Sequence, residues 1–240
     1  MRKNNFAVAS LFGISFTVLI MLLFSTPGSA EEKKSAIKIR EGLVGVIGYG
    51  TLMLLPSLEK TLGHPYEGPA YQVHVRDYVR GWAYRLPNND PQVNAAEAEK
   101  INACFLRNNE RIPFAGTVNL NVYPEKNGRI NCILYLLTGE DLLKIDKRER
   151  DYKRVDVTDK IEEYDFSGGS VYIYEGLPEN ADTSSSDPKK YILIKEYVDQ
   201  VTMACDRIGK DFRAEFDKST RAIAYQIVSF AMIVWGKSDK

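Results

Sequence analysis

The order of the predicted elements indicates an α+β fold with a mixed or barrel-like sheet. A strand and a helix come first, many consecutive strands follow, and a short helix, further strands and terminal helices complete the chain. This order lacks the regular alternation of strands and helices that a doubly wound α/β fold requires. No linker divides the roughly 210 residues after residue 30, so we expect a single domain over residues 31–240.

A buried strand, a glycine turn and a helix are predicted first. The strand and turn read LVGVIGYGTL (residues 43–52). The helix covers residues 54–63, because Pro56 suits a first turn and Gly63 suits a helix end. Four strand-like runs follow, and Asn127-Gly128 predicts a hairpin between the last two. These runs cover residues 70–86, 101–106, 112–123 and 129–138.

A short amphipathic helix follows at residues 139–150, with acids near its positive end. Two more strands are predicted after it, and a polar segment rich in Ser, Asp and Pro reads as a surface loop. Two helices are expected to close the chain. Polar residues interrupt the second of them, so we expect a buried core helix rather than a membrane span. The strands are at 152–161 and 170–176, the loop at 177–190, and the helices at 191–208 and 217–235.

The first 30 residues, 1–30, have the pattern of a secretory signal peptide. Arg2 and Lys3 precede an uncharged run over residues 4–24, and small residues lead up to Ala30, where a signal peptidase would cleave. We therefore expect an exported protein, either periplasmic or extracellular. The alternative is an uncleaved anchor that holds the protein at the outer face of the membrane, because the apolar run is nearly long enough to span a bilayer.

The charge balance gives no support to nucleic-acid binding. The chain has 32 Lys+Arg and 32 Asp+Glu; removing Arg2 and Lys3 with the leader leaves 30 against 32, a formal charge of −2. The nearest approach to a basic cluster, KIDKRERDYKRVDV, is interleaved with acids. We expect no nucleic-acid partner and contact with the membrane only through an uncleaved leader, and the sequence leaves the oligomeric state open.

The three cysteines encode neither a zinc site nor a redox motif. Cys104, Cys132 and Cys205 are widely spaced, with no CxxC pair and no histidine nearby, so we expect no bound metal. In an exported protein a disulfide between Cys104 and Cys132 is conceivable, because both lie in strand-like runs. The alternative is that these cysteines are small buried hydrophobic side chains.

Two common enzyme signatures do not occur in the sequence. Gly48 and Gly50 follow a strand and precede a helix, but a dinucleotide-binding GxGxxG would need glycine where Met53 stands. There is no GxSxG elbow, and the only histidines, His64 and His74, are expected to be structural or solvated. We therefore expect no nucleotide or other cofactor.

One carboxylate, Glu149, is placed where it could transfer protons. It lies at the junction of the helix 139–150 and the strand 152–161, in a charge run where a solvated acid would also be ordinary. A glycine-rich turn can direct successive backbone N–H groups at an anion or a developing oxyanion. A carboxylic acid held opposite such a turn can act as acid and base. The turn at residues 49–52 and Glu149 together therefore favour catalysis.

Four motifs occur in order along the chain: YGTL (Tyr49–Leu52), RGW (Arg80–Trp82), DKRERDYKRVDV (Asp146–Val157) and VYIYEG (Val171–Gly176). Together they resemble the γ-glutamylcyclotransferase-like family, which includes the AIG2-like proteins. The resemblance covers about residues 44–208. It implies a compact α+β fold in which a small mixed β-barrel carries flanking helices, with a cavity between the YGTL turn and the acid.

The same resemblance implies a reaction and a set of site residues. The free α-amine of a γ-glutamyl group would attack its own γ-carbonyl and release 5-oxoproline and an amine or amino acid. No metal or organic cofactor is needed, because the nucleophile is already tethered to the carbonyl. The general acid/base would be Glu149, in the D-x-x-E pattern begun by Asp146, and the substrate-binding residues would be Tyr49, Gly50, Thr51, Leu52 and Tyr152.

Two features depart from the familiar members of that family. Arg150 and Asp151 follow Glu149 where Gly and a longer segment are usual, which could alter the pocket mouth. Familiar members act in the cytosol, whereas the leader predicts export, so the substrate could be a γ-glutamyl peptide, glutathione or a peptidoglycan fragment with a free α-amine. The alternative function is a non-catalytic member of the same fold that binds a small ligand or an envelope partner.

Overall fold

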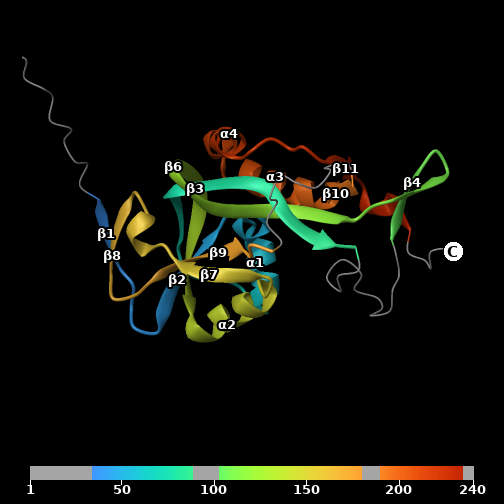
Figure 1. The fold of residues 1–240 in the computed structure, drawn as a ribbon. Helices are drawn as coiled ribbons and strands as arrows, with labels where there is room; N and C mark the ends of the chain where they lie inside the picture. Colours follow the sequence, from blue (N-terminus) through green and yellow to red (C-terminus); the bar gives the residue numbers. More distant parts are fainter. Residues whose placement is uncertain (1–33, 89–102, 180–189, 235–240) are drawn as a thin grey trace, which may run out of the picture. The chain divides into compact units, whose positions relative to one another are not determined.

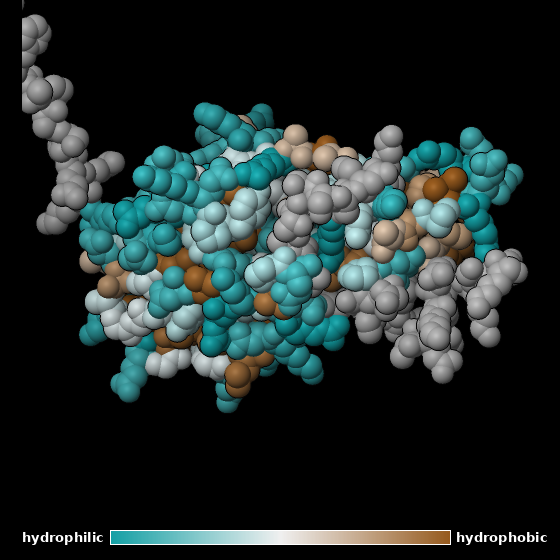
Figure 2. Space-filling view, in the orientation of Figure 1, coloured by the Kyte–Doolittle hydropathy of each residue, from teal (hydrophilic) through white to brown (hydrophobic). Residues whose placement is uncertain are grey.

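The computed structural model describes residues 34–88, 103–179 and 190–234, which belong to one compact unit (Figure 1). The expected leader, residues 1–30, and most of the expected loop 177–190 lie outside the described residues. None of the described helices is long and apolar enough to cross a membrane. The visible face of the described part is mainly hydrophilic, with hydrophobic residues scattered over it (Figure 2).

A seven-stranded sheet is organised around one long strand, β6, which pairs with three neighbours. The strand order is β11-β10-β6-β2-β9-β7, and β3 pairs with β6 off this path, so antiparallel and parallel pairings are mixed. The strands are β2 (Leu43–Gly48), β3 (Ala70–Pro87), β6 (Gly116–Thr138), β7 (Tyr152–Asp156), β9 (Val171–Gly176), β10 (Tyr191–Ile194) and β11 (Gln226–Val228).

The α+β class with a mixed sheet is therefore confirmed, and the barrel is not. The pairings of the described strands run from β11 to β7 without closing into a ring. The other described strands form two small sheets: β1 (Ser35–Lys38) with β8 (Tyr164–Ser167), and β12 (Ile233–Val234) with β4 (Cys104–Arg107) and β5 (Glu110–Pro113).

The described residues form four α-helices, and local signals explain where two of them begin or end. The first helix ends at Gly63, whose φ of 75° is left-handed and suits glycine. The second begins after Thr138, whose hydroxyl accepts a hydrogen bond from the N–H of Asp141. Figure 1 shows α4 and α2 on opposite sides of the strands. The helices are α1 (Leu55–Leu62), α2 (Gly139–Arg148), α3 (Lys195–Ile208) and α4 (Lys210–Ser219).

The predicted hairpin at Asn127-Gly128 is wrong. The two segments it was to connect are one strand, β6, and the residues between Pro124 and Arg129 bulge out opposite Asp77 of β3. Asp77 and Asn127 both take positive φ values, of 58° and 65°, and an oxygen of Asp77 accepts a hydrogen bond from the N–H of Asn127. The turn-forming dipeptide therefore forms part of a β-bulge, because pairing with β3 continues on both sides of it.

The predicted terminal helix over residues 217–235 is also wrong. The helix α4 ends at Ser219, and residues 226–228 form β11, which pairs with β10 in parallel. The short strand β12 then pairs with β4, and Val228 and Ile233 pack into a small second core with Phe105. Pairing with strands distant in sequence thus determines the structure of this apolar segment.

The cysteines behave as small hydrophobic side chains. All three are free thiols in the structure, and Cys132 and Cys205 are buried in the main core. Burial raises the pKa of each of these two thiols to about 12, which keeps them protonated and unreactive. Cys104 is partly exposed on β4.

A buried arginine, Arg80 of the RGW motif, joins the sheet to α4. Its guanidinium donates to the Asn131 carbonyl at 2.7 Å, to the Asn131 side-chain oxygen at 2.8 Å, and to the hydroxyls of Ser219 and Thr220 at 2.9 and 2.8 Å. It also lies over the ring of Phe216, 3.7 Å from the ring centre. Burial lowers the pKa of Arg80 to about 10, so the group stays charged at neutral pH.

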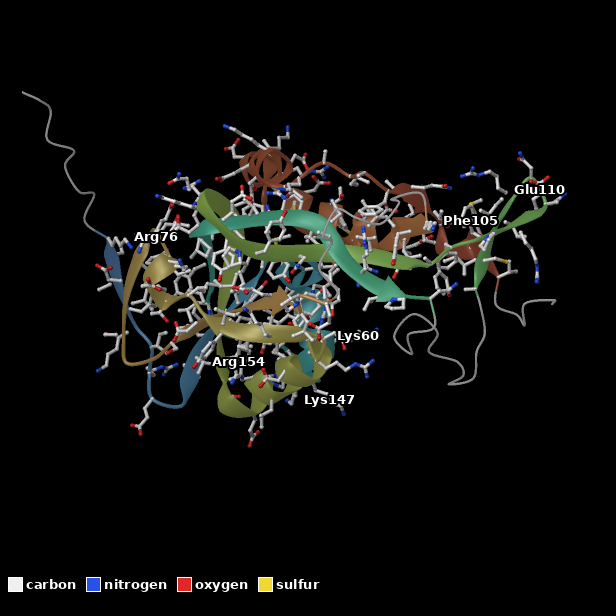
Figure 3. The ribbon with its side chains drawn as sticks, viewed as in Figure 1. Lys60, Arg76, Phe105, Glu110, Lys147 and Arg154 are labelled. Carbon is white, nitrogen blue, oxygen red and sulfur yellow. The ribbon has the colours of Figure 1, made fainter. Side chains whose placement is uncertain are left out.

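We expect Arg80→Ala to lower the free energy of unfolding by about 3–5 kcal/mol, because it leaves a cavity and removes the donors that satisfy several buried acceptors. Chemical denaturation would measure the change. The matched control is Arg76→Ala on the same strand, an exposed arginine that donates to the Asp159 carbonyl and should cost less than about 1 kcal/mol (Figure 3). Equal losses in the two variants would show that Arg80 does not join the sheet to α4.

Candidate functional site

The YGTL turn connects β2 to a single turn of 3-10 helix, η1 (Thr51–Met53). A side chain at Gly48 would put Cβ 3.0 Å from the backbone of Leu52, so glycine lets the turn fold tightly against the end of β2. The hydroxyl of Tyr49 donates to the carbonyl of Tyr174 on β9 at 2.8 Å. In such a turn, the first N–H groups have no acceptor within the turn itself.

Glu149 occupies the junction between α2 and β7, as the sequence predicts. It is the residue that ends α2, where its N–H donates to the Ile145 carbonyl at 2.8 Å and its own carbonyl accepts from the N–H of Tyr152 at 2.9 Å. These two backbone bonds fix its position. Its side chain is only 16% exposed, so it is not a solvated acid in a charge run.

All six predicted site residues line one pocket. The pocket holds about 350 Å³ of empty space, counting the solvent at its mouth. The YGTL turn and Glu149, 97 or more positions apart in sequence, are therefore brought to the same cavity, as the resemblance implies. The lining residues are Ile47, Tyr49, Gly50, Thr51, Leu52, Leu120, Glu149, Tyr152, Tyr174 and Tyr197.

Arg148 is the residue of the site that the sequence reasoning missed. Its Nε lies 3.0 Å from Glu149 Oε1, and its Nη2 donates to the hydroxyl of Thr51 at 2.8 Å. Its Nη1 donates to Ser57 and to the hydroxyl of Thr61 on α1, the latter at 2.6 Å. One guanidinium thus links the acid, the YGTL turn and α1. A basic residue beside the predicted acid was the available signal.

The environment of Glu149 favours the protonated form of its carboxyl. Burial raises the pKa of the Glu149 carboxyl, the charge and hydrogen bond of Arg148 partly offset this, and Asp151 adds a smaller upward effect. The net pKa lies above the ordinary value, so the carboxyl can both accept and return a proton. Burial is therefore the main cause, and Arg148 limits the increase.

Four tyrosines surround the acid and form the polar part of the wall. The hydroxyl of Tyr152 donates to the Leu120 carbonyl at 3.3 Å, and the hydroxyl of Tyr197 accepts from the Leu120 N–H at 3.3 Å. Tyr174 donates to Asp146 at 2.6 Å, which gives the first acid of the D-x-x-E pattern a positioning role. Burial raises the pKa of Tyr49 and of Tyr152 well above the ordinary value and that of Tyr197 to about 12, so these phenols stay neutral.

Both histidines lie outside this pocket. His64 contacts Asp141 at 3.0 Å, and His74 lies between Glu163 and Glu215, the latter at 2.8 Å. His74, Glu162 and Glu163 are close enough in space to bind a metal ion. Arg129, however, pairs with Glu162 at 2.7 Å and with Glu215 at 2.5 Å, so cations within the chain already balance these carboxylates. The cluster has the character of an ion network between β3, β6 and α4.

Comparison with known proteins gives structural similarity without sequence similarity. No family model matches the sequence, and no curated protein matches it. A solved γ-glutamyl cyclotransferase is similar over 78% of this chain and 94% of its own, at 7% identity and a TM-score of 0.45. An uncharacterised protein from Homo sapiens is similar over 80% of this chain and 96% of its own, at 9% identity and a TM-score of 0.48.

A yeast γ-glutamyl cyclotransferase specific to glutathione is also similar, over 77% of this chain and all of its own, at 10% identity and a TM-score of 0.39. γ-Glutamyl cyclotransferase structures are thus among the solved structures to which this chain is similar. Likeness at such TM-scores supports no functional assignment, and the assignment depends on the pocket itself.

We expect Glu149→Gln to stabilise the fold at pH 7. A carboxyl whose pKa is raised in the folded state stabilises the fold below its unfolded pKa, and this contribution is lost as pH rises through the folded pKa. The uncharged amide avoids that loss. Thermal unfolding at pH 7 and pH 4 would show a higher Tm for the variant at pH 7 and a smaller difference at pH 4. A lower Tm for the variant at pH 7 would contradict a raised pKa.

Proposed function

We propose that the protein is a γ-glutamylcyclotransferase. The observation that carries this proposal is that Glu149, a nearly buried carboxyl with a raised pKa, lines the same pocket as the YGTL turn. The substrate is a γ-glutamyl compound with a free α-amine. Its amine nitrogen bonds to its own γ-carbonyl carbon, the bond from that carbon to the leaving nitrogen breaks, and 5-oxoproline and an amine or amino acid are released.

Glu149 moves the proton in both halves of this reaction. An α-amine has a reference pKa near 8, so much of the substrate is protonated at neutral pH and must lose a proton before it attacks. That first proton goes to solvent. The ionised carboxylate then accepts the proton that the attacking nitrogen releases as the new C–N bond forms, and delivers it to the leaving nitrogen. Neither water nor a further reactant is consumed, and the tether between nucleophile and carbonyl supplies the proximity that a bimolecular attack would lack.

The remaining pocket residues bind the substrate and position the acid. The backbone at the start of η1, with the N–H groups of the YGTL turn, suits the γ-carbonyl oxygen, which becomes negative during attack. The tyrosine hydroxyls and Thr51 supply polar contacts for the glutamyl amine and α-carboxylate. Arg148 holds Glu149 and Thr51 in a fixed relation.

We also propose that the protein acts outside the cytoplasm, on the strength of its basic, then uncharged, then small-residue leader over residues 1–30. N-terminal sequencing of the protein recovered from its native host would test this. A first residue near Glu31 supports cleavage and export. An intact leader on a protein found in the cytoplasm would contradict it.

We expect Glu149→Gln to reduce 5-oxoproline release by at least about a hundred-fold, because general acid–base catalysis contributes about 10²–10⁴. Purified residues 31–240 would be assayed with γ-glutamyl dipeptides, γ-glutamylamines, glutathione and peptidoglycan fragments that have a free α-amine. The matched control, Glu140→Gln, changes an exposed acid in the first turn of α2 and should retain wild-type activity. A folded wild-type protein that turns over none of these compounds would favour the non-catalytic binding protein.

We expect Arg148→Met to move the acidic limb of the pH–rate profile to higher pH. Arg148 lowers the pKa of Glu149, so its removal raises that pKa further, and kcat/KM then rises only at higher pH. Arg148→Lys keeps a positive charge and should shift the limb less. If the acidic limb lies at the same pH in the wild type, Arg148→Met and Arg148→Lys, Arg148 does not act through Glu149.

A further inference from the structure

A second depression adjoins the pocket, and we name it the basic groove. It is larger than the pocket, with about 1530 Å³ of empty space counting open solvent, and it shares Thr51 and Tyr197 with the pocket. A molecule whose γ-glutamyl head occupies the pocket would therefore have its other end at this groove. The groove is lined by Thr51, Leu54, Pro56, Ser57, Lys60, Thr61, Lys144, Lys147, Arg148, Tyr197, Gln200 and Met203.

The lining of the basic groove has four cationic side chains and no carboxylate. Two of the cations are already paired, Arg148 with Glu149 and Lys144 with Asp141. Lys60 and Lys147 are exposed, and neither side chain makes a hydrogen bond or ion pair with another residue of the described chain. They lie on α1 and α2, which pack against each other (Figure 3).

From this arrangement we infer that the basic groove binds the leaving part of the substrate and selects one that carries free carboxylates. The inference rests on the proposed function and specifies its substrate class: γ-glutamyl peptides with an acidic leaving group, over γ-glutamylamines. Two unpaired lysines suit two carboxylates, and Leu54 and Met203 offer apolar contact to the chain between them. A neutral leaving group gains nothing from Lys60 and Lys147, and a cationic one is repelled.

Four substrates whose leaving groups differ in charge test this. The wild-type protein should show the highest kcat/KM with γ-glutamylglutamate, then γ-glutamylalanine, then γ-glutamylbutylamine, and the lowest with γ-glutamyl-1,4-diaminobutane. Each exposed ion pair should contribute about two- to five-fold. The differences in kcat/KM between these substrates should decrease as the salt concentration is raised, because exposed charges are screened. Equal kcat/KM values across the series would overturn the inference while leaving cyclisation established.

Reversing the charge of Lys60 and Lys147 tests whether these two lysines cause the preference for an acidic leaving group. Lys60→Glu combined with Lys147→Glu should lower kcat/KM for γ-glutamylglutamate by about ten-fold and leave that for γ-glutamylbutylamine nearly unchanged. The corresponding Lys→Gln pair should give a smaller loss. Lys126→Glu with Lys210→Glu makes the same change in net charge at exposed lysines that do not line the groove, and it should leave both values at wild-type level. If this control lost as much kcat/KM for γ-glutamylglutamate, the preference would depend on net charge, which would contradict binding in the basic groove.

A binding measurement tests the charge selectivity of the basic groove independently of turnover. N-acetyl-γ-glutamylglutamate and N-acetyl-γ-glutamylbutylamine cannot cyclise, because an acylated amine is not a nucleophile. Calorimetry should show tighter binding of the first, and the Lys60→Glu/Lys147→Glu protein should abolish the difference. If no substrate is turned over but this difference is present, the proposed catalysis fails and the charge selectivity stands. If substrates are turned over but the two N-acetyl compounds bind equally tightly, the proposed catalysis stands and the charge selectivity fails.

Discussion

The burial of Glu149 at the end of α2, against the guanidinium of Arg148, is the constraint on which the site depends. Ionising a carboxyl away from water is unfavourable, and Arg148 offsets part of this penalty. The same guanidinium binds Thr51 of the YGTL turn and two hydroxyl-bearing residues of α1. The position of the acid, the position of the turn and the packing of α1 against α2 are therefore coupled through one side chain.

This coupling explains why the chain can hold an acid that is unfavourable for the fold. The helix end and the first residue of β7 fix the backbone of Glu149, and the tyrosines around it are themselves held by the backbone of Leu120 and by Asp146. Rigid support of this kind keeps a functional carboxyl in place although its ionised form costs stability. The sheet supplies the support, because β2, β7 and β9 are neighbours in it.

Local signals in the sequence predicted the parts of the fold that depend on neighbouring residues. The helix ending at Gly63, the helix ending near Glu149 and the strand beginning at Tyr152 are all present. Parts that depend on distant pairing were not predicted: Asn127-Gly128 forms a bulge because β3 runs along both halves of β6, and residues 226–228 form a strand because β10 is available. For the site, the motifs located the pocket. The local signal for Arg148 was its position beside Glu149, and its contacts with Thr61 and Thr51, 87 and 97 positions away, could not be predicted from it.

The central claim is that the substrate's own amine, and not water, attacks the γ-carbonyl. Mass spectrometry of the products formed in ¹⁸O-labelled water tests it most directly. The account predicts 5-oxoproline without ¹⁸O, together with the free amine or amino acid. Glutamate that carries ¹⁸O would identify a hydrolase using the same carboxyl as the base for water, and would contradict the cyclisation proposed for this pocket.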